Sequence, residues 1–433
     1  MINTLLKNIR QYIKSEFLVY FFACFLVLYR GVIYELDSYA FLSMEINRSS
    51  GYIIFLSFFK KIFGSYFEYP LLIVQLTINI YGVWILHTCL RRILKFQKLF
   101  SVLSLLILLA PLLYLHLTAN KLQTEALAYP LYLIFIANCI YGLVRLQKKN
   151  LIYGAMVLLI LIFVRGQFLS LVPIGLIVTT YMLIITNKRS YALVGLLFIT
   201  IPFLSNLFDK SFHYYQYGHF VATPFTGPSI GAAVFYVSDK EDVVLFNSKE
   251  EREYFKSVKK RLDEKEWTSS FANTYDSISS FDHFRQNYVN ICNQTIHEYG
   301  LQHFEKKGLS SDMQYIATDN LLLKMYKPLL LDNFKEWLKL YIQNIKASLG
   351  NSKYLLLHIV LFAFGILLLL RRKDLVLGKF ISFVILCTFS NIALLAIATH
   401  SDKRYVFYND WVLFIVLFVF LDRYFNTVPK EKN

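Results

Sequence analysis

The chain has 433 residues, of which 56% are hydrophobic and only 17% are charged. Soluble globular proteins are about one quarter charged, so this composition excludes an ordinary soluble domain. The apolar residues gather in runs of roughly twenty, the length that a helix needs to cross a hydrocarbon core. The net charge of +16 lies mostly in short loops between these runs, which indicates contact with anionic lipid and not with nucleic acid.

Ten apolar runs predict ten spanning helices in an all-α polytopic membrane protein. The run at 151–164 is short, about 21 Å long at helical rise, so Arg165 is expected partly within the membrane. Such a residue either lines a bundle interior or wet cavity or extends its side chain to the headgroups. In chain order the runs cover residues 17–34, 69–90, 99–117, 126–144, 151–164, 168–186, 191–208, 353–370, 375–399 and 411–425.

The polar connections between the runs alternate in charge. Lys and Arg crowd "RRILKFQK" (91–98), "RLQKKN" (145–150), "NKRS" (187–190) and "RRKD" (371–374). The positive-inside rule places these loops in the cytoplasm. The opposite, extracytoplasmic side then receives residues 35–68, 118–125, 165–167, 209–350 and 400–410.

Two outer segments have structure of their own. Residues 39–66 predict two short helices at the outer interface. In the long segment, residues 214–239 are rich in Gly, Pro and aromatics and predict a loop with short strands, and helical patterns follow at 248–267, 282–300 and 320–349. Pro328 is expected to break the last of these or to start a new helix, leaving an amphipathic helix at 329–349. The predicted organisation is therefore an N-terminal membrane module (1–208), an extracytoplasmic domain (209–350) and a C-terminal membrane module (351–433).

Polar residues from distant parts of the chain are expected to meet on the outer face. Taken singly, such loop charges are usually solvated. Together, carboxylates beside positive charges at one depth suit a site that binds an anionic lipid headgroup and removes a proton from an acceptor. The residues are Glu35 and Asp37 after the first run, Glu125 at the start of the fourth, Arg165 and Gln167 before the sixth, and His400, Asp402, Lys403, Arg404 and Tyr405 before the last.

The order of these motifs resembles the GT-C superfamily of membrane glycosyltransferases, which includes protein O-mannosyltransferases and lipid A aminoarabinose transferases. "ELDSYAFL" (35–42) followed by "SSGYIIFLSFFKKIFG" (49–64) matches the acidic position and amphipathic stretch after the first span, although Ile53 stands where the family has a proline. "QTEALAYPLYL" (123–133), "VRGQFL" (164–169) and the Arg404-Tyr405 pair match further outer-face motifs. The resemblance covers most of the chain as architecture and implies a GT-C-like bundle.

The resemblance also implies a function. The protein would be a bacterial inner-membrane glycosyltransferase that moves a sugar from a polyprenyl-phosphate donor to an extracytoplasmic acceptor in surface glycan assembly. Asp37 would be the catalytic base, with Glu35 orienting the acceptor or sharing the role. Arg404 would hold the lipid phosphate. The remaining substrate-binding candidates are Arg165 for the phosphate or the sugar, Tyr405 and Gln167 for sugar hydroxyls, and Glu125 and His400.

Several alternatives stay open from the sequence. Some GT-C members use a divalent metal and others do not; the absence of an outer DxD motif favours independence from metal here. An O-antigen or capsule polymerase is also polytopic with a large outer loop, but the carboxylate after the first span favours GT-C. A lipid-linked sugar flippase or transporter would place charges in span centres and repeat its halves, and a membrane scaffold would not explain the convergence of polar residues.

Overall fold

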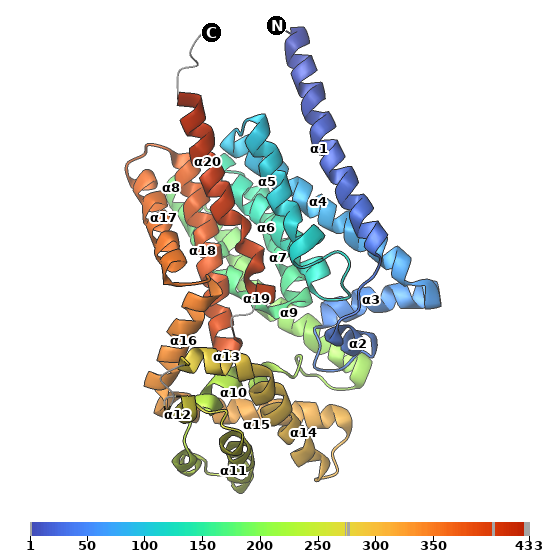
Figure 1. Ribbon diagram of the computed structural model, residues 1–433, viewed down its shortest axis with the longest axis vertical. Helices are drawn as coiled ribbons and strands as arrows, with labels where there is room; N and C mark the ends of the chain where they lie inside the picture. Colours follow the sequence, from blue (N-terminus) through green and yellow to red (C-terminus); the bar gives the residue numbers. More distant parts are fainter. Residues whose placement is uncertain (1, 273, 275–277, 401–402, 428–433) are drawn as a thin grey trace.

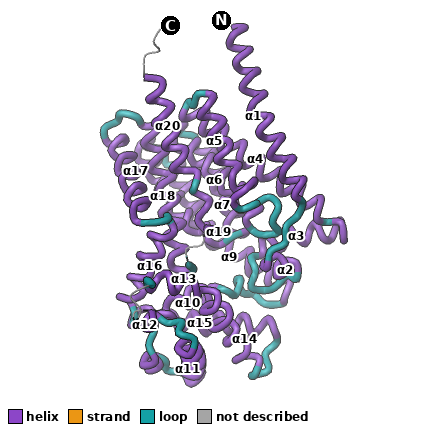
Figure 2. The backbone as a smooth tube through the Cα atoms, viewed as in Figure 1, coloured by secondary structure: helices purple, strands orange, loops and turns teal. Residues whose placement is uncertain are grey.

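The computed structural model describes residues 2–272, 274, 278–400 and 403–427. Across these residues the protein is helical, and the β structure amounts to one parallel bridge between Ile33 and Lys121 (Figure 2). The predicted all-α class is confirmed.

Eight helical stretches in the described part of the chain are long and apolar enough to cross a membrane. They correspond to eight of the ten predicted runs, and they make the protein a multi-pass membrane protein. They are α4 (Glu68–Leu94), α5 with a π-helical turn η2 (Lys98–Leu115), α6 (Glu125–Arg145), η3 with α8 (Gly166–Thr186), α9 (Ser190–Tyr217), α17 (Ser352–Leu370), α18 (Leu375–Ala398) and α19 with η6 and α20 (Lys403–Phe425).

The other two predicted runs also fall in helices. The helix α7 (Lys148–Val164) has 17 residues and packs against α6 and α9 inside the bundle. The helix α1 (Ile2–Arg30) runs along the edge of the bundle, from the end where both termini lie towards the end that carries α2 and α3 (Figure 1). That these two helices cross the membrane, for a total of ten, stays a prediction.

Two short helices follow α1, as the sequence predicts: α2 (Leu36–Leu42) and α3 (Ser50–Phe63). The apolar face of α3 is buried against the bundle because Gly51 allows a close approach to the end of α7. A Cβ atom on Gly51 would lie 2.7 Å from the carbonyl oxygen of Phe163. The contact fixes the start of α3 against the end of α7, the helix that Arg165 follows.

The segment after α9 forms a helical domain at the end of the molecule opposite the termini (Figure 1). Its apolar core, which includes Phe235, Phe255 and Leu322, is a cluster separate from that of the bundle. The helix α9 itself continues from the bundle past residue 208 to Tyr217. The elements are α10 (Thr226–Val237), η4 (Lys240–Leu245), α11 (Lys249–Glu264), α12 (Ser269–Ala272), α13 (Ser280–Ile291), the π-helix η5 (Cys292–His297), α14 (Glu298–Glu305), α15 (Ser311–Asp332) and α16 (Phe334–Ser348).

Two predictions for this domain are wrong. Residues 226–237, expected in a loop with short strands, form α10, and Gly227 allows close packing there in place of a turn. A Cβ atom on Gly227 would lie 2.6 Å from the carbonyl oxygen of Asp319 on α15. Pro328 lies inside α15, where buried Met325 and Leu329 hold the helix in the domain core, and the break comes only at Asn333.

Candidate functional site

The segments that follow α1 and precede α6 are joined side by side. The amide of Ile33 donates to the carbonyl of Asn120 at 2.9 Å, and the amide of Leu122 donates to the carbonyl of Ile33 at 3.1 Å. The Ser38 hydroxyl in α2 donates to the carbonyl of Leu122 at 3.0 Å. These bonds bring the start of α2, with Asp37, next to the start of α6, with Glu125.

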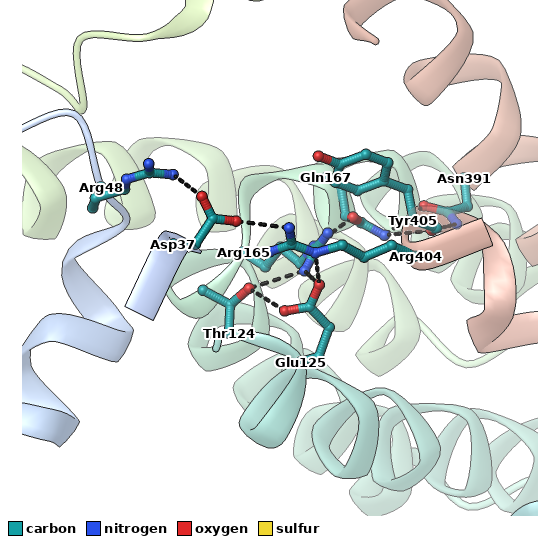
Figure 3. Close-up of polar contacts among 9 residues, drawn as sticks. All are labelled: Asp37, Arg48, Thr124, Glu125, Arg165, Gln167, Asn391, Arg404 and Tyr405. Atoms are coloured by element: carbon teal, nitrogen blue, oxygen red, sulfur yellow. Dashed lines mark hydrogen bonds and ion pairs between the residues drawn. The ribbon is translucent and has the colours of Figure 1, made fainter. Parts of the chain in front are cut away.

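Glu125 is the centre of a buried ionic network (Figure 3). Its Oε1 atom lies 2.5 Å from Nε of Arg404 and 2.7 Å from Nη1 of Arg165. The Thr124 hydroxyl accepts from Arg165 at 2.9 Å and donates to the other carboxylate oxygen at 3.1 Å. The Glu125 side chain is 5% exposed and that of Arg165 is 10% exposed, so the pair lies away from water.

Arg404 extends this network to Asp37. Its Nη1 atom lies 2.7 Å from Oδ2 of Asp37, while Nη1 of Arg48 lies 3.2 Å from Oδ1. The Asp37 side chain is 26% exposed, so this carboxylate stays in reach of a ligand. One guanidinium, placed before the last span, therefore bridges a carboxylate after the first predicted span and a carboxylate at the start of α6.

The network carries more positive than negative charge. It joins three guanidiniums (Arg48, Arg165 and Arg404) with two carboxylates (Asp37 and Glu125). A fixed positive excess beside low-dielectric protein attracts anions more strongly than the same charges would in water. Arginine also matches the oxygens of a phosphate through its planar set of N–H donors.

Gln167 and Tyr405 border the network from two further elements. The Gln167 amide oxygen accepts from Nε of Arg165 at 2.6 Å, and its amide nitrogen donates to the Tyr405 carbonyl at 3.1 Å and to Asn391 at 3.3 Å. The Arg165 guanidinium lies over the Tyr405 ring, 5.1 Å from its centroid. Arg165 is thus held in one orientation by a carboxylate, an amide and an aromatic ring.

Two predicted site residues have other partners. Glu35 lies at the start of α2 and pairs with Lys121 at 2.7 Å. His400 stacks on Tyr288 of the helical domain, with ring centroids 4.3 Å apart. Asp402 lies outside the described residues, so of the predicted residues the contacts join Asp37, Glu125, Arg165, Gln167, Arg404 and Tyr405.

Three residues of the site were missed from the sequence: Arg48, Thr124 and Asn391. Arg48 is a cation in the same predicted outer segment as Glu35 and Asp37, and its place beside these carboxylates was a usable signal. Asn391 is a polar residue inside a predicted span, which is also a recognised sign of function. Thr124 gave no signal beyond its place before Glu125.

The described residues hold no group of three or more His, Cys, Asp or Glu side chains that could bind a metal ion. The dependence of any activity on metal stays a prediction. No family model, curated protein or solved structure matches this chain.

Proposed function

We propose that the protein is a GT-C-type glycosyltransferase that moves a hexosyl or pentosyl group from a polyprenyl-phosphate donor to an acceptor hydroxyl. The observation that supports this most directly is the pair of contacts from Arg404 to Asp37 and to Glu125. These contacts join the partly exposed carboxylate of Asp37 to an arginine, a side chain suited to binding phosphate. They lie where the helical domain meets the bundle.

In the proposed reaction Asp37 is the general base. The acceptor hydroxyl passes its proton to an Asp37 oxygen as its own oxygen forms a bond to the anomeric carbon. The bond from that carbon to the phosphate oxygen breaks, and polyprenyl phosphate leaves with the electron pair. Arg48 and Arg404 hold both Asp37 oxygens, which fixes the orientation of the base.

Arg404 and Arg165 are proposed to bind the donor phosphate. A phosphate that enters the network would replace Asp37 as a partner of Arg404 and would be neutralised by the positive excess. Because the leaving phosphate gains charge as the glycosidic bond breaks, these guanidiniums would stabilise the transition state more than the bound donor. Glu125 would keep both guanidiniums in place in the absence of donor.

The proposed location is the bacterial inner membrane, with the site on the extracytoplasmic face and the product part of a surface glycan. This orientation is supported by the basic ends of spanning helices, including Arg91 and Arg92 of α4 and Arg145 of α6. Under the positive-inside rule these ends are cytoplasmic. Both termini lie at one end of the molecule and the helical domain at the other (Figure 1).

The test is transfer by the purified protein in liposomes, with membrane extract as acceptor and radiolabelled sugar on three donors: polyprenyl phosphate, a lipid diphosphate and a nucleotide. Transfer from polyprenyl phosphate alone is the expected result. Transfer that requires a lipid-diphosphate oligosaccharide would identify a polymerase and reject the proposal. Arg404→Lys keeps the charge but loses the planar donors, so we expect it to raise the donor KM; an unchanged donor KM would remove Arg404 from the phosphate site.

A further inference from the structure

A cavity of about 590 Å³ lies between the bundle and the helical domain. Its walls come from the α2–α3 connection, the turn after α7, α9 and the start of α10. About half of the lining side chains carry a hydroxyl, amide or carboxylate group, and the rest are apolar. The lining includes Asn47, Ser49, Gly166, Asp209, Thr223 and Phe225.

The charge of the cavity differs from that of the network. Asp209 is the one ionisable side chain among the lining residues. Its carboxylate accepts from the Thr223 amide at 2.7 Å and from the Ser50 hydroxyl. A carboxylate with no cation in the lining disfavours phosphate, so the cavity suits a neutral ligand that offers hydroxyl groups.

Within the described part of the chain, three buried polar atoms in or near the lining have no hydrogen-bond partner. They are Oδ1 of the lining residue Asn47, Nε of its neighbour Arg48, and Nε2 of His297, which contacts the lining residue Phe225 but is not itself in the lining. The His297 ring packs edge-on against Phe225, with centroids 5.1 Å apart. Most buried polar groups in folded proteins are paired. A ligand with several hydroxyl groups supplies both donors and acceptors, and a small shift of the Asn47 side chain would let its Oδ1 atom accept from such a group.

The backbone at His297 is unusual as well. Residues Cys292–His297 form a π-helical turn, an element found often at functional sites. Burial, and then the positive charge of Arg48, lower the pKa of His297 to about 4. The ring is therefore neutral at pH 7, so it adds no positive charge behind Phe225 that would favour an anionic ligand.

We propose that this cavity binds the acceptor as a neutral carbohydrate, with Asn47 as a hydrogen-bonding residue and Phe225 as an apolar contact. The proposal rests on the transferase function above and names the acceptor class. Arg48, which lies between two lining residues in the chain, binds Asp37 at 3.2 Å, and Gly166 follows Arg165. Two lining segments are thus joined through the chain to the ionic network, one through a partner of the proposed base and the other through the proposed phosphate site.

Binding can be tested without donor or transfer. A Cβ atom on Gly166 would meet no atom of the described residues within 4 Å, apart from its chain neighbours, so Gly166→Cys places a thiol in the cavity. Four of the five native cysteines are buried, and labelling of the wild type by a maleimide gives the background. The probes are maltotetraose, cellotetraose and chitotetraose, with inorganic phosphate for comparison, and exposed Ser352→Cys is the control thiol.

At least one oligosaccharide is expected to slow the labelling of Gly166→Cys several-fold and to leave Ser352→Cys unchanged. Phosphate is expected to have no effect on either thiol. Equal labelling rates with and without every oligosaccharide, or protection by phosphate instead, would overturn the proposal.

Asn47→Leu provides a second test, in the transfer assay. The Oδ1 atom of Asn47 has no hydrogen-bond partner among the residues that the structure describes, so its loss should leave the thermal unfolding temperature unchanged. The acceptor KM should rise about tenfold, as for the loss of a hydrogen bond worth about 1.4 kcal/mol, while the donor KM stays constant. Asn320→Leu, on an exposed part of α15, is the matched control.

An unchanged acceptor KM in Asn47→Leu would reject the cavity as the acceptor site even if the wild type transfers sugar. Protection of Gly166→Cys by oligosaccharide in a protein that transfers nothing would reject the transferase function and keep the carbohydrate site. The two failures therefore have different signatures.

Discussion

Glu125→Gln should destabilise the protein strongly. The substitution leaves Arg165, with its side chain 10% exposed, in a buried site without a carboxylate. Removing one partner of a buried ion pair costs about 3–5 kcal/mol, because the remaining charge stays desolvated. We expect a loss of that size in the free energy of unfolding.

Asp37→Asn should behave differently. The Asp37 side chain is 26% exposed, and ion pairs open to water contribute about 0.2–1 kcal/mol each. Arg404 keeps its contact with Glu125 in this variant. The loss of stability should therefore stay near 1 kcal/mol, although the same variant removes the proposed base.

The assay is unfolding in mixed detergent micelles by titration with sodium dodecyl sulfate, followed by tryptophan fluorescence. A double-mutant cycle adds Arg165→Met, alone and together with Glu125→Gln. Because the double variant has no unpaired charge at this position, it should be more stable than the sum of the single losses predicts, by about 2 kcal/mol or more.

Unfolding of Glu125→Gln at the same detergent fraction as the wild type would refute this reasoning. Additive losses of unfolding free energy in the double-mutant cycle would also refute it, because additivity means that the side chains of Glu125 and Arg165 do not interact. Either result would mean that water reaches Glu125 and that the network is not a fixed phosphate site.

Two further predictions concern packing and pH. Gly51→Ala should lower the free energy of unfolding by about 1–3 kcal/mol in the same titration, because the added methyl group meets the backbone of Phe163; an unchanged midpoint would show that α3 does not pack closely on α7. In the helical domain, burial lowers the pKa of His297 to about 4 and raises that of Asp319 to about 6. The lowered pKa of His297 reduces the free energy of unfolding by about 3 kcal/mol as the pH falls from 6.5 to 4. The raised pKa of Asp319 reduces it by about 3 kcal/mol as the pH rises from 4 to 6. Relative to the wild type, His297→Gln should thus gain stability towards pH 4 and Asp319→Asn towards pH 6; parallel pH profiles of all three proteins would contradict both shifts.

Hydropathy was sufficient to predict eight of the helices that can span a membrane, because a run of about twenty apolar residues has few alternatives to a membrane helix. Local sequence was a weaker guide in the helical domain. Gly227 and Pro228 look like turn residues, yet Gly227 is needed for the close approach of α10 to α15. Pro328 looks like a helix break, yet core packing keeps α15 intact past it. Both depend on tertiary contacts that a local pattern does not contain.

For the site, topology predicted that residues far apart in sequence would lie together on the outer face; several of them are in contact, and the face stays a prediction. Asp37, Glu125 and Arg404 do meet, because each stands next to an apolar run that fixes its depth. The partners inside loops could not be predicted in this way. Arg48 reaches Asp37 only because α3 folds back on α7, and Glu35 pairs with Lys121 through the bridge between two loops.

The central claim is that Asp37 removes the acceptor proton during transfer from a polyprenyl-phosphate sugar. It is tested most directly by the transfer rate of Asp37→Asn in liposomes, beside Glu45→Gln, which removes a carboxylate from the same outer segment. We expect Asp37→Asn to abolish transfer while its detergent midpoint stays near that of the wild type, and Glu45→Gln to retain transfer. Full transfer by Asp37→Asn would contradict the account.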